Sequence, residues 1–559
     1  MVLHLLFPAS MPCLPQHEDP SQQNRRQNQL ERNRKAYQYD YDFLKPLPLL
    51  DTIRQKLPFA EWMTIPYLVT RIARSIPLPI NQTLARIWAL WDRVDELQDY
   101  ENFFTIFPKP KVIKTIKAMP DEMFGEQHLS GVNPMVIRRV TEIPIEWGFT
   151  LQELQIVLEQ QTDDSENPLV NVEQEFSKGN LYVADYAMLS FVQSGSYQGI
   201  QQYLPAPRAF FYYHKAQNLG RLQFLPIAIQ MNPNRGIASS FITPAQPEWN
   251  WNYAKLCVQI ADANYHEMIS HLCHTHFVME PFAIATARQL SKKHPLNVLL
   301  RPHFRFLLVN GELARSRLLG YIDRLLPGSL EESLQLVRKS YEDWNFKAFA
   351  FPTEIKQREM VDAPYYPYRD DGKRLWDTIY KFVSDYLRIY YKNDFDIQND
   401  TELKAWIEEL VAQNGGRVKG LENKIEYVEE LIDIVTNIIF TCGPQHSAIN
   451  YSQYEYMTYM PNMPLALYQP VREDASIPDQ SSFTPCLPPR TQAAEQLAIM
   501  YILSLPYYYD KLGHYKRPFA DPLARECVKQ FQEKLKQIEN RGSAYPYMNP
   551  NQITNSISM

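Results

Sequence analysis

Glycine is scarce in this sequence, at 18 of 559 residues, and neither GxGxxG nor GxxxxGK[ST] occurs. Glycine-rich loops of these two kinds let the backbone approach a phosphate closely, so their absence argues against a nucleotide-binding protein. The net charge is −6 with both signs mixed along the chain. A nucleic-acid partner would require a basic face, and we expect none.

Cysteine pairs and long apolar runs are also missing. The six cysteines are scattered without a CxxC pair, which argues against a disulfide framework or a zinc ribbon and suits a reducing cytoplasm. The amino-terminal run MVLHLLFPASMPCLP has no preceding basic residues, unlike a signal peptide. No stretch of 18 uncharged apolar residues occurs, so we expect a cytoplasmic protein that does not span a membrane.

The remaining composition is that of a protein with a large core, at 45% hydrophobic and 21% charged residues. Residues 14 to about 35 are polar and rich in Gln, Asn and Arg, and we interpret residues 1–36 as a mobile leader. Short β-branched and aromatic runs within 179–232 predict a small sheet. From Trp249 onward the chain follows a helical pattern. We therefore expect a mostly α protein with a minor β element, and one domain over 37–559.

The most unusual stretch is HEMISHLCHTHFVME, residues 266–280, in which His266, His271 and His276 lie five residues apart. A regular α-helix would leave side chains at this spacing about 140° apart. The surrounding helix, 251–292, is apolar all round and therefore buried, so its imidazoles need partners. One interpretation is that they are core histidines bonded to backbone carbonyls. The other is that His271 and His276 lie on either side of a π-bulge and bind one metal. His266 would then support a ligand by hydrogen bonding.

A second motif lies in TCGPQHSAINYSQY, residues 441–454, where His446 and Asn450 share one helix face. Imidazole with a side-chain amide is an unusual ligand pair, better suited to a redox metal than to structural zinc. By itself the motif carries little information. Together with the first helix it predicts a single metal site.

These residues carry a resemblance to a known family. Over about Asp92 to Met559 the sequence is similar to the catalytic domain of lipoxygenases, the dioxygenases of polyunsaturated fatty acids, and most of all to compact cyanobacterial members. The matching stretches are GVNPMVIRRV (131–140), the whole of 251–305, YPYRDDGKRLWDTIYKFVSDYLRIYY (366–391), NDTELKAW (399–406), GPQHSAINYSQY (443–454) and NSISM (555–559). Plant and animal members also carry an amino-terminal β-barrel, for which the region before Tyr37 is too short.

The resemblance implies one non-haem iron held by His271, His276, His446, Asn450 and the terminal carboxylate of Met559, where relatives usually end in Ile. Some fungal relatives use manganese instead. A ferric ion with a bound hydroxide would take a hydrogen atom from the CH2 between two cis double bonds. Molecular oxygen would then add to give a hydroperoxide. The implied substrates are linoleate, linolenate and arachidonate, and the implied protein is a monomer that contacts membrane surfaces transiently.

The tail supports this reading, because GSAYPYMNPNQITNSISM after Arg541 contains no charged side chain and is expected to be buried. The resemblance also places an apolar substrate pocket along 303–326. Ala314 matches a position where Ala or Gly is linked to S or R oxygen insertion, and Ala suggests S. Leu318 and Ile322 match positions linked to the reacting carbon, and Leu325 and Leu326 match positions linked to pocket depth.

Three other functions remain open. A hydroperoxide isomerase would use the same iron. A zinc hydrolase would use the histidines as ligands and Glu267 or Glu280 as the base. A non-catalytic helical protein would hold the histidines as satisfied core residues and bind no stoichiometric metal.

Overall fold

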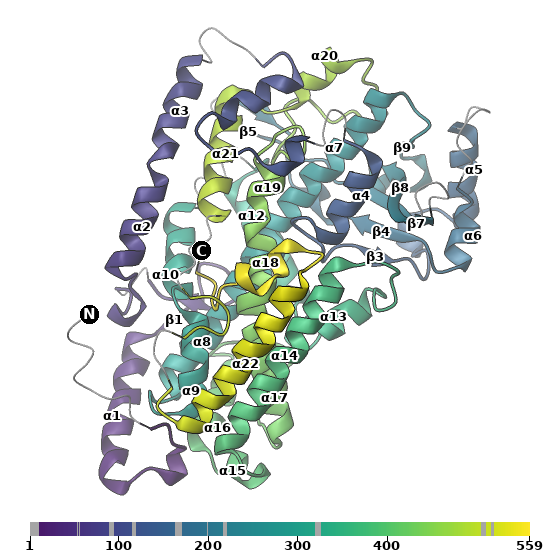
Figure 1. Ribbon diagram of the computed structural model, residues 1–559. Coiled ribbons are helices and arrows are strands. Elements are labelled where there is room, and N and C mark those ends of the chain that lie inside the picture. The colour runs from purple at the N-terminus through teal and green to yellow at the C-terminus, as the bar shows by residue number, and fades with distance from the viewer. Residues whose placement is uncertain are drawn as a thin grey trace.

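A long interrupted helix forms the centre of the molecule (Figure 1). It consists of α7 (Glu248–Tyr265), the π-helix η9 (His266–Phe277) and α8 (Val278–Gln289). The computed structural model describes residues 11–52, 54, 56–88, 94–114, 119–161, 170–197, 199–215, 221–318, 326–504, 510–515 and 519–558. Almost every residue of the central helix is buried, as its all-round apolar pattern predicted.

Most elements of the described structure are helices, so the expected mostly α fold is confirmed. Among the described residues the other α-helices are α1 (Pro20–Ala36), α2 (Ile65–Ser75), α3 (Pro77–Trp88), α4 (Asp121–Ser130), α5 (Leu151–Gln161), α6 (Val172–Ser177), α9 (Pro295–Leu300), α10 (Leu307–Leu313), α12 (Leu330–Asp343), α13 (Phe351–Gln357), α14 (Pro367–Tyr390), α15 (Asp394–Gln398), α16 (Thr401–Val411), α17 (Val428–Phe440), α18 (His446–Tyr451), α19 (Gln453–Met457), α20 (Gln480–Phe483), α21 (Arg490–Ser504) and α22 (Pro522–Arg541). Two further π-helices are η11 (Ala314–Leu318) and η12 (Thr441–Gln445).

Helices α14, α17 and α22 run side by side (Figure 1). Each carries apolar residues at helical spacing, and α14 buries the stripe that contains Leu375, Ile379 and Phe382. The ring of Phe382 stacks on Phe531 of α22 with 4.4 Å between ring centroids. Among the described helices, none combines the length and apolarity that a transmembrane span requires.

The predicted β element is a five-stranded antiparallel sheet in the order β3-β4-β7-β8-β9. Its strands are β3 (Arg138–Arg139), β4 (Tyr182–Asp185), β7 (Arg208–Lys215), β8 (Leu222–Gln230) and β9 (Phe241–Ile242), and two short pairs lie elsewhere, β1 (Tyr39–Asp40) with β2 (Leu49–Leu50) and β5 (Gly195–Tyr197) with β6 (Ile200–Gln202).

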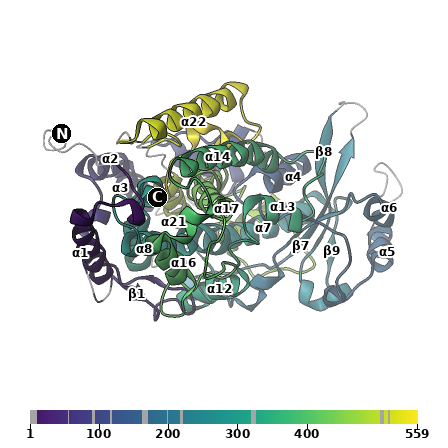
Figure 2. The same cartoon turned by 90° about the horizontal axis from the view of Figure 1, so that it is seen from below.

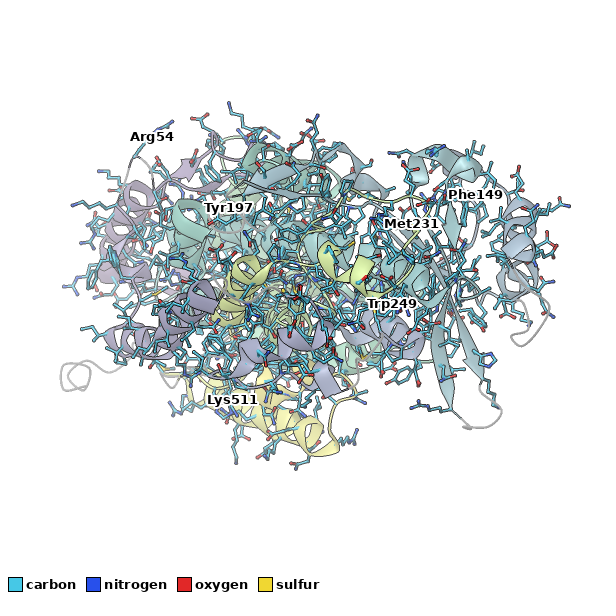
Figure 3. The ribbon with its side chains drawn as sticks, turned by 90° about the horizontal axis from the view of Figure 1, so that it is seen from above. Arg54, Phe149, Tyr197, Met231, Trp249 and Lys511 are labelled. Atoms are coloured by element: carbon cyan, nitrogen blue, oxygen red, sulfur yellow. The ribbon has the colours of Figure 1, made fainter. Side chains whose placement is uncertain are left out.

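Successive phenylalanines of β7 point to opposite faces of this sheet, as strand geometry requires. Phe210 joins a cluster with α5 and α6, whereas Phe211 packs with Phe124 of α4 in the main core. Figure 2 shows the sheet at one end of the molecule, with α5 and α6 outside it and α1, α2 and α3 at the opposite end. In Figure 3, Phe149 and Arg54 mark these two ends.

The expectation of a mobile leader over residues 1–36 was wrong for the part that the structure describes. Residues 20–36 form helix α1, capped by Asp19. Buried Arg26 pairs with Glu402 of α16 and with Glu18, and the Asn33 amide donates to the Ala287 carbonyl of α8 at 2.7 Å. Polar composition alone suggested disorder, but these side chains find charged and carbonyl partners on distant helices.

Candidate metal centre

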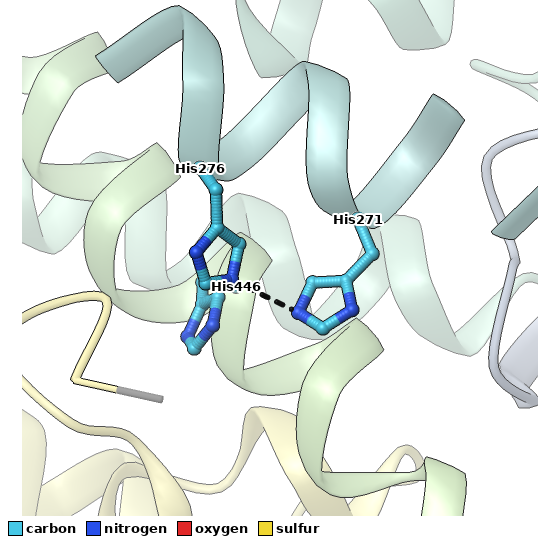
Figure 4. Close-up of side chains that lie close together, drawn as sticks. All are labelled: His271, His276 and His446. Carbon is cyan, nitrogen blue, oxygen red and sulfur yellow. Dashed lines mark hydrogen bonds between the residues drawn. The ribbon is translucent and has the colours of Figure 1, made fainter. Parts of the chain in front are cut away.

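The π-helix η9 brings histidines that are five residues apart onto one side. Its i→i+5 hydrogen bonds widen the turn, so His271 and His276 project together, as the spacing predicted. Their Nε2 atoms lie 3.1 Å apart, drawn as the dashed line in Figure 4. All twelve residues of η9 are buried.

The third histidine comes from a second helix that faces η9. The π-turn η12 precedes α18 and contains Pro444, which has no N–H to give to a regular α-helical ladder. His446 is the first residue of α18 and is fully buried. Its ring centroid lies 5.6 Å from that of His271 and 5.1 Å from that of His276. One nitrogen from each of the three rings falls within 4.8 Å of the others.

Two of the three rings, those of His271 and His276, lie where protonation is disfavoured. Burial lowers the pKa of His271 to about 3. Burial also lowers the pKa of His276 well below its usual value, and the neighbouring His271 and His446 lower it further. At neutral pH His271 and His276 therefore carry lone pairs, the form in which imidazole binds metals.

The cluster fits a metal ion on geometry as well as on charge. Two imidazole nitrogens bound at right angles to one ion through bonds of about 2.1 Å lie about 3 Å apart, and the His271 and His276 Nε2 atoms are separated by 3.1 Å. An ion bound to these Nε2 atoms would compensate part of the cost of burying the polar rings.

His266 lies behind the cluster and links its two helices. The Ile449 carbonyl of α18 accepts a hydrogen bond from His266 Nε2 at 3.1 Å. The His266 ring stacks on His271, with 5.4 Å between centroids and 28° between planes. These contacts match the expected position behind a ligand, and its effect on a metal remains a prediction.

Asn450 lies one turn after His446 on α18 and is fully buried. Its amide nitrogen donates to the Leu503 carbonyl at 2.9 Å, and its Oδ1 accepts from Gln453 Nε2 at 3.1 Å. These bonds fix the orientation of the amide. Whether its oxygen also binds a metal remains a prediction.

The carboxy-terminal segment passes directly beside these helices. Residues 553–558 are buried as expected, whereas Gly542, Ala544 and Pro546 at its start are exposed. The Thr554 N–H donates to Ser447 Oγ of α18 at 3.2 Å. Gly443 of η12 allows this approach, because a Cβ there would lie 3.1 Å from the Thr554 carbonyl oxygen. Met559 itself lies outside the described residues.

Sequence reasoning missed the residues that hold this segment in place. His303 Nδ1 donates to the Asn555 carbonyl at 2.7 Å, the Asn310 amide donates to the Ile557 carbonyl at 3.4 Å, and Tyr67 of α2 donates to the Ser558 carbonyl. We call Tyr67, His303 and Asn310 the tail clamp. No local pattern marks them, since each acts on main-chain carbonyls more than 240 residues away.

The expected pocket residues are described only in part. Ala314 begins η11 and is buried, and Leu326 is buried in the main core. The side chain of Leu318 and the whole of Ile322 and Leu325 lie outside the described residues. The pocket roles of all five therefore stay predictions.

Of the carboxylates proposed as hydrolytic bases, Glu280 is engaged elsewhere. Arg315 Nη1 donates to its Oε1 at 2.8 Å, and the Leu50 N–H donates to its Oε2 at 3.0 Å. Glu267 is buried, and burial raises its pKa. Its Oε2 lies 3.9 Å from Nδ1 of His271.

The fold and the site define a large helical protein with three converging histidines at its centre that could hold a non-haem metal ion. The family model for lipoxygenases matches residues 15–545. The polyunsaturated fatty acid lipoxygenase ALOX8 of Mus musculus is 30% identical over 572 residues, covering 97% of this chain and 81% of that protein. The linoleate 9/13-lipoxygenase of Pseudomonas aeruginosa is 32% identical over 536 residues, covering 90% and 76%.

Solved structures agree with the sequence relatives. A lipoxygenase in complex with arachidonate superposes with a TM-score of 0.87 at 28% identity, covering 98% of this chain and 84% of that one. The chain belongs to the lipoxygenase family, whose members are dioxygenases that use non-haem iron. Among eight curated relatives, it spans between 55% and 81% of their own length.

Proposed function

We propose that this protein is an iron-dependent lipoxygenase that adds molecular oxygen to polyunsaturated fatty acids containing a cis,cis-1,4-pentadiene. The observation that carries the proposal is the convergence of His271, His276 and His446 from two helices in a buried site. By the family resemblance, these three positions match the histidines that bind the iron in lipoxygenases. The family resemblance adds Asn450 and the terminal carboxylate of Met559 to this set, and favours iron over manganese.

When bound here, iron would supply the one-electron oxidant that removes a hydrogen atom from the CH2 between the two double bonds. The chain's own residues hold the donors in place. Widened turns at η9 and η12 position the three rings, and His266 joins the two helices behind them. The tail clamp holds the carboxy-terminal segment against α18.

Burial gives these residues a second role, which is to keep water away. The main core packs against the central helix through α12, α16 and α18. A carbon radical formed in such an apolar site would meet oxygen rather than solvent. Ala314, small and buried, is our candidate for the residue that leaves room for oxygen beside the pentadiene.

The substrate class is proposed from the relatives. One acts on linoleate by name, and one was solved with arachidonate. We propose fatty acids of this class as substrates, with oxygen inserted in the S configuration, as Ala at position 314 suggests. We also propose that the protein is a monomer in the cytoplasm that reaches lipid surfaces only transiently.

The alternative within the same family is a hydroperoxide isomerase. It would use the same iron but consume a fatty-acid hydroperoxide without net uptake of oxygen. The two activities are therefore separated by their substrates and by oxygen consumption, not by metal content.

The test combines three measurements on the purified protein. We expect one iron per chain by elemental analysis, conjugated-diene absorbance on addition of linoleate, and one oxygen consumed per diene formed. His271→Ala, His276→Ala and His446→Ala should each lose iron and diene formation, because each removes a strong ligand. His274→Ala is the matched control, since His274 on the same π-helix bonds Ser340 Oγ at 2.7 Å and not the cluster.

Three outcomes would contradict the proposal. Stoichiometric zinc with hydrolytic activity would favour a hydrolase. Full iron and full turnover in any one of the three histidine variants would remove that residue from the site. Consumption of a hydroperoxide without oxygen uptake, in the absence of activity on linoleate, would favour the isomerase.

A further inference from the structure

One surface of the molecule is more apolar than folding requires. Nine of the twenty exposed large apolar side chains among the described residues fall within the short stretch 59–87, and their exposed fractions range from 43% to 92%. We call these nine residues the outer stripe: Phe59, Trp62, Ile65, Leu68, Val69, Ile72, Ile76, Ile80 and Ile87. A contiguous apolar patch of this kind marks an interaction site rather than ordinary surface.

The outer stripe follows the helical period along one outward side of α2 and α3. Residues 65, 69, 72, 76, 80 and 87 recur at steps of three, four or seven, the spacing of one helix face. The two helices follow one another along the edge of the molecule (Figure 1). At 1.5 Å per residue, 65–88 corresponds to about 36 Å of helix.

The inner side of these helices is already satisfied by other contacts. Tyr67 of α2 is fully buried in a small cluster with Phe306 and Val309. On α3, Leu78 and Ala85 are buried, and the helix packs on α21. The outer stripe therefore contributes little to holding α2 and α3 in place, and its apolar character calls for an external partner.

Charge distinguishes between the candidate partners. Residues 62–88 contain three arginines and no acidic residue, in a chain of net charge −6. Arg74 and Arg86 are exposed, whereas Arg71 contacts Tyr67 and Asn310 on the inner side. A second copy docked by two-fold symmetry would bring these like charges together. An anionic lipid surface would attract them instead. Trp62 and Phe59 at one end suit the headgroup region of a bilayer.

We propose that the outer stripe docks flat onto an anionic phospholipid surface, as an amphipathic helix pair lying in the interface. The inner side of the same helix then faces the carboxy-terminal segment, because Tyr67 donates to the Ser558 carbonyl. Docking therefore turns the side of the protein that contains Ser558 toward the lipid. The proposal concerns binding and does not depend on the reaction at the histidines.

The test measures binding of the full chain to vesicles by co-sedimentation. Wild type should bind vesicles of phosphatidylcholine with phosphatidylglycerol more tightly than vesicles of phosphatidylcholine alone. The double variant Val69→Asp/Ile72→Asp should bind at least about tenfold more weakly, because it places two charges in the docked face. Arg74→Gln and Arg86→Gln should each weaken binding to the anionic vesicles about fivefold.

Two controls keep the test specific. Ile145→Asp and Phe395→Asp change side chains that are 95% and 71% exposed outside the outer stripe, and should leave vesicle binding unchanged. Circular dichroism should show that every variant remains folded. Turnover of detergent-dispersed linoleate should be the same in wild type and in the Val69/Ile72 double variant, whereas turnover of linoleate held in vesicles should fall.

Three results would overturn the proposal. One is equal vesicle binding by wild type and the double variant. Another is the same loss of binding in Ile145→Asp or Phe395→Asp. The third is that wild type forms a dimer and does not bind vesicles, whereas the double variant is a monomer. That result would assign the outer stripe to contact with a second copy of the chain. Failure of the histidine cluster to bind iron would leave the vesicle measurement unaffected.

Discussion

Replacing His266 by Phe tests whether a residue that touches no metal still controls how the metal is held. His266 Nε2 donates to the Ile449 carbonyl of α18 at 3.1 Å. The ring itself stacks on His271. Phenylalanine keeps the ring and most of the volume but removes the donor. His266→Phe therefore isolates the hydrogen bond between the two metal-binding helices.

The size of the effect follows from what happens to the carbonyl. The Ile449 oxygen also accepts from Ser452 Oγ at 3.1 Å, so the variant does not leave it unsatisfied. The loss is then that of one hydrogen bond, about 0.5–1.5 kcal/mol. Residues that support metal ligands typically change metal affinity by about 10- to 100-fold. Because the Ile449 carbonyl keeps its bond from Ser452, we expect His266→Phe to weaken metal affinity by about tenfold, the lower end of that range.

The assay is iron affinity, measured by competition with a chelator, together with diene formation per bound iron. We expect about tenfold weaker iron binding and unchanged turnover per iron, because the ligands themselves remain. His271→Phe should abolish binding. His274→Phe is the matched control, because His274 is a buried histidine of the same π-helix that bonds Ser340 and not the cluster. Burial lowers the pKa of His274 to about 4, so this residue is also a neutral imidazole at neutral pH.

Several results would refute this reasoning. Loss of iron as complete as in His271→Phe would make His266 a ligand and would mean that the faces of η9 are assigned wrongly. Unchanged affinity would mean that the bond to Ile449 does not position the helices. An equal loss in His274→Phe would point to general disruption of η9.

Three further predictions concern other parts of the chain. Met559→Ile should retain iron and diene formation, whereas deleting Met559 or adding a carboxy-terminal tag should lose both. The reason is that the position of the terminal main-chain carboxylate depends on chain length and not on the last side chain. A fully active tagged protein would refute this. Ala314→Gly should change product chirality or position by opening space for oxygen, as chiral chromatography would show, and an unchanged distribution would exclude Ala314 from that role. Burial raises the pKa of Asp262 from 3.8 to about 7, so the folded protein keeps a proton that the unfolded chain loses. The free energy of unfolding should therefore fall between about pH 4 and 7, by about 4 kcal/mol for the full shift. Asp262→Asn should remove that part of the slope in denaturant titrations, and an identical slope in the variant would show that Asp262 is ionised in the fold.

The central helix and its π-turn could be predicted from the sequence because both depend on local information. An all-round apolar pattern indicates a buried helix wherever it packs. Histidines five apart in such a helix point to the same side only if the turn widens, and η9 has that geometry. The small sheet followed from alternating β-branched and aromatic runs, whose period is set by the strand itself.

The amino-terminal helix shows where composition misleads. Residues 20–36 contain few apolar side chains, and this suggested a disordered leader. Arg26 is instead buried between Glu18 and Glu402, and the second of these lies 376 residues further along the chain. Composition records how many charges a segment has, but it does not record whether distant charges of opposite sign will meet them.

The sequence by itself determined the helical class, the widened turn and the histidines that lie on it. It also determined that α2 and α3 carry an apolar stripe. Only the tertiary structure decided that the stripe faces outward. The spacing of apolar residues shows which of them share a helix face, but it does not show whether the rest of the chain packs against that face. Tertiary structure likewise brought His446 to His271 and His276, and set Tyr67, His303 and Asn310 around the tail. Those contacts join segments far apart in sequence, and their geometry depends on how every intervening helix packs.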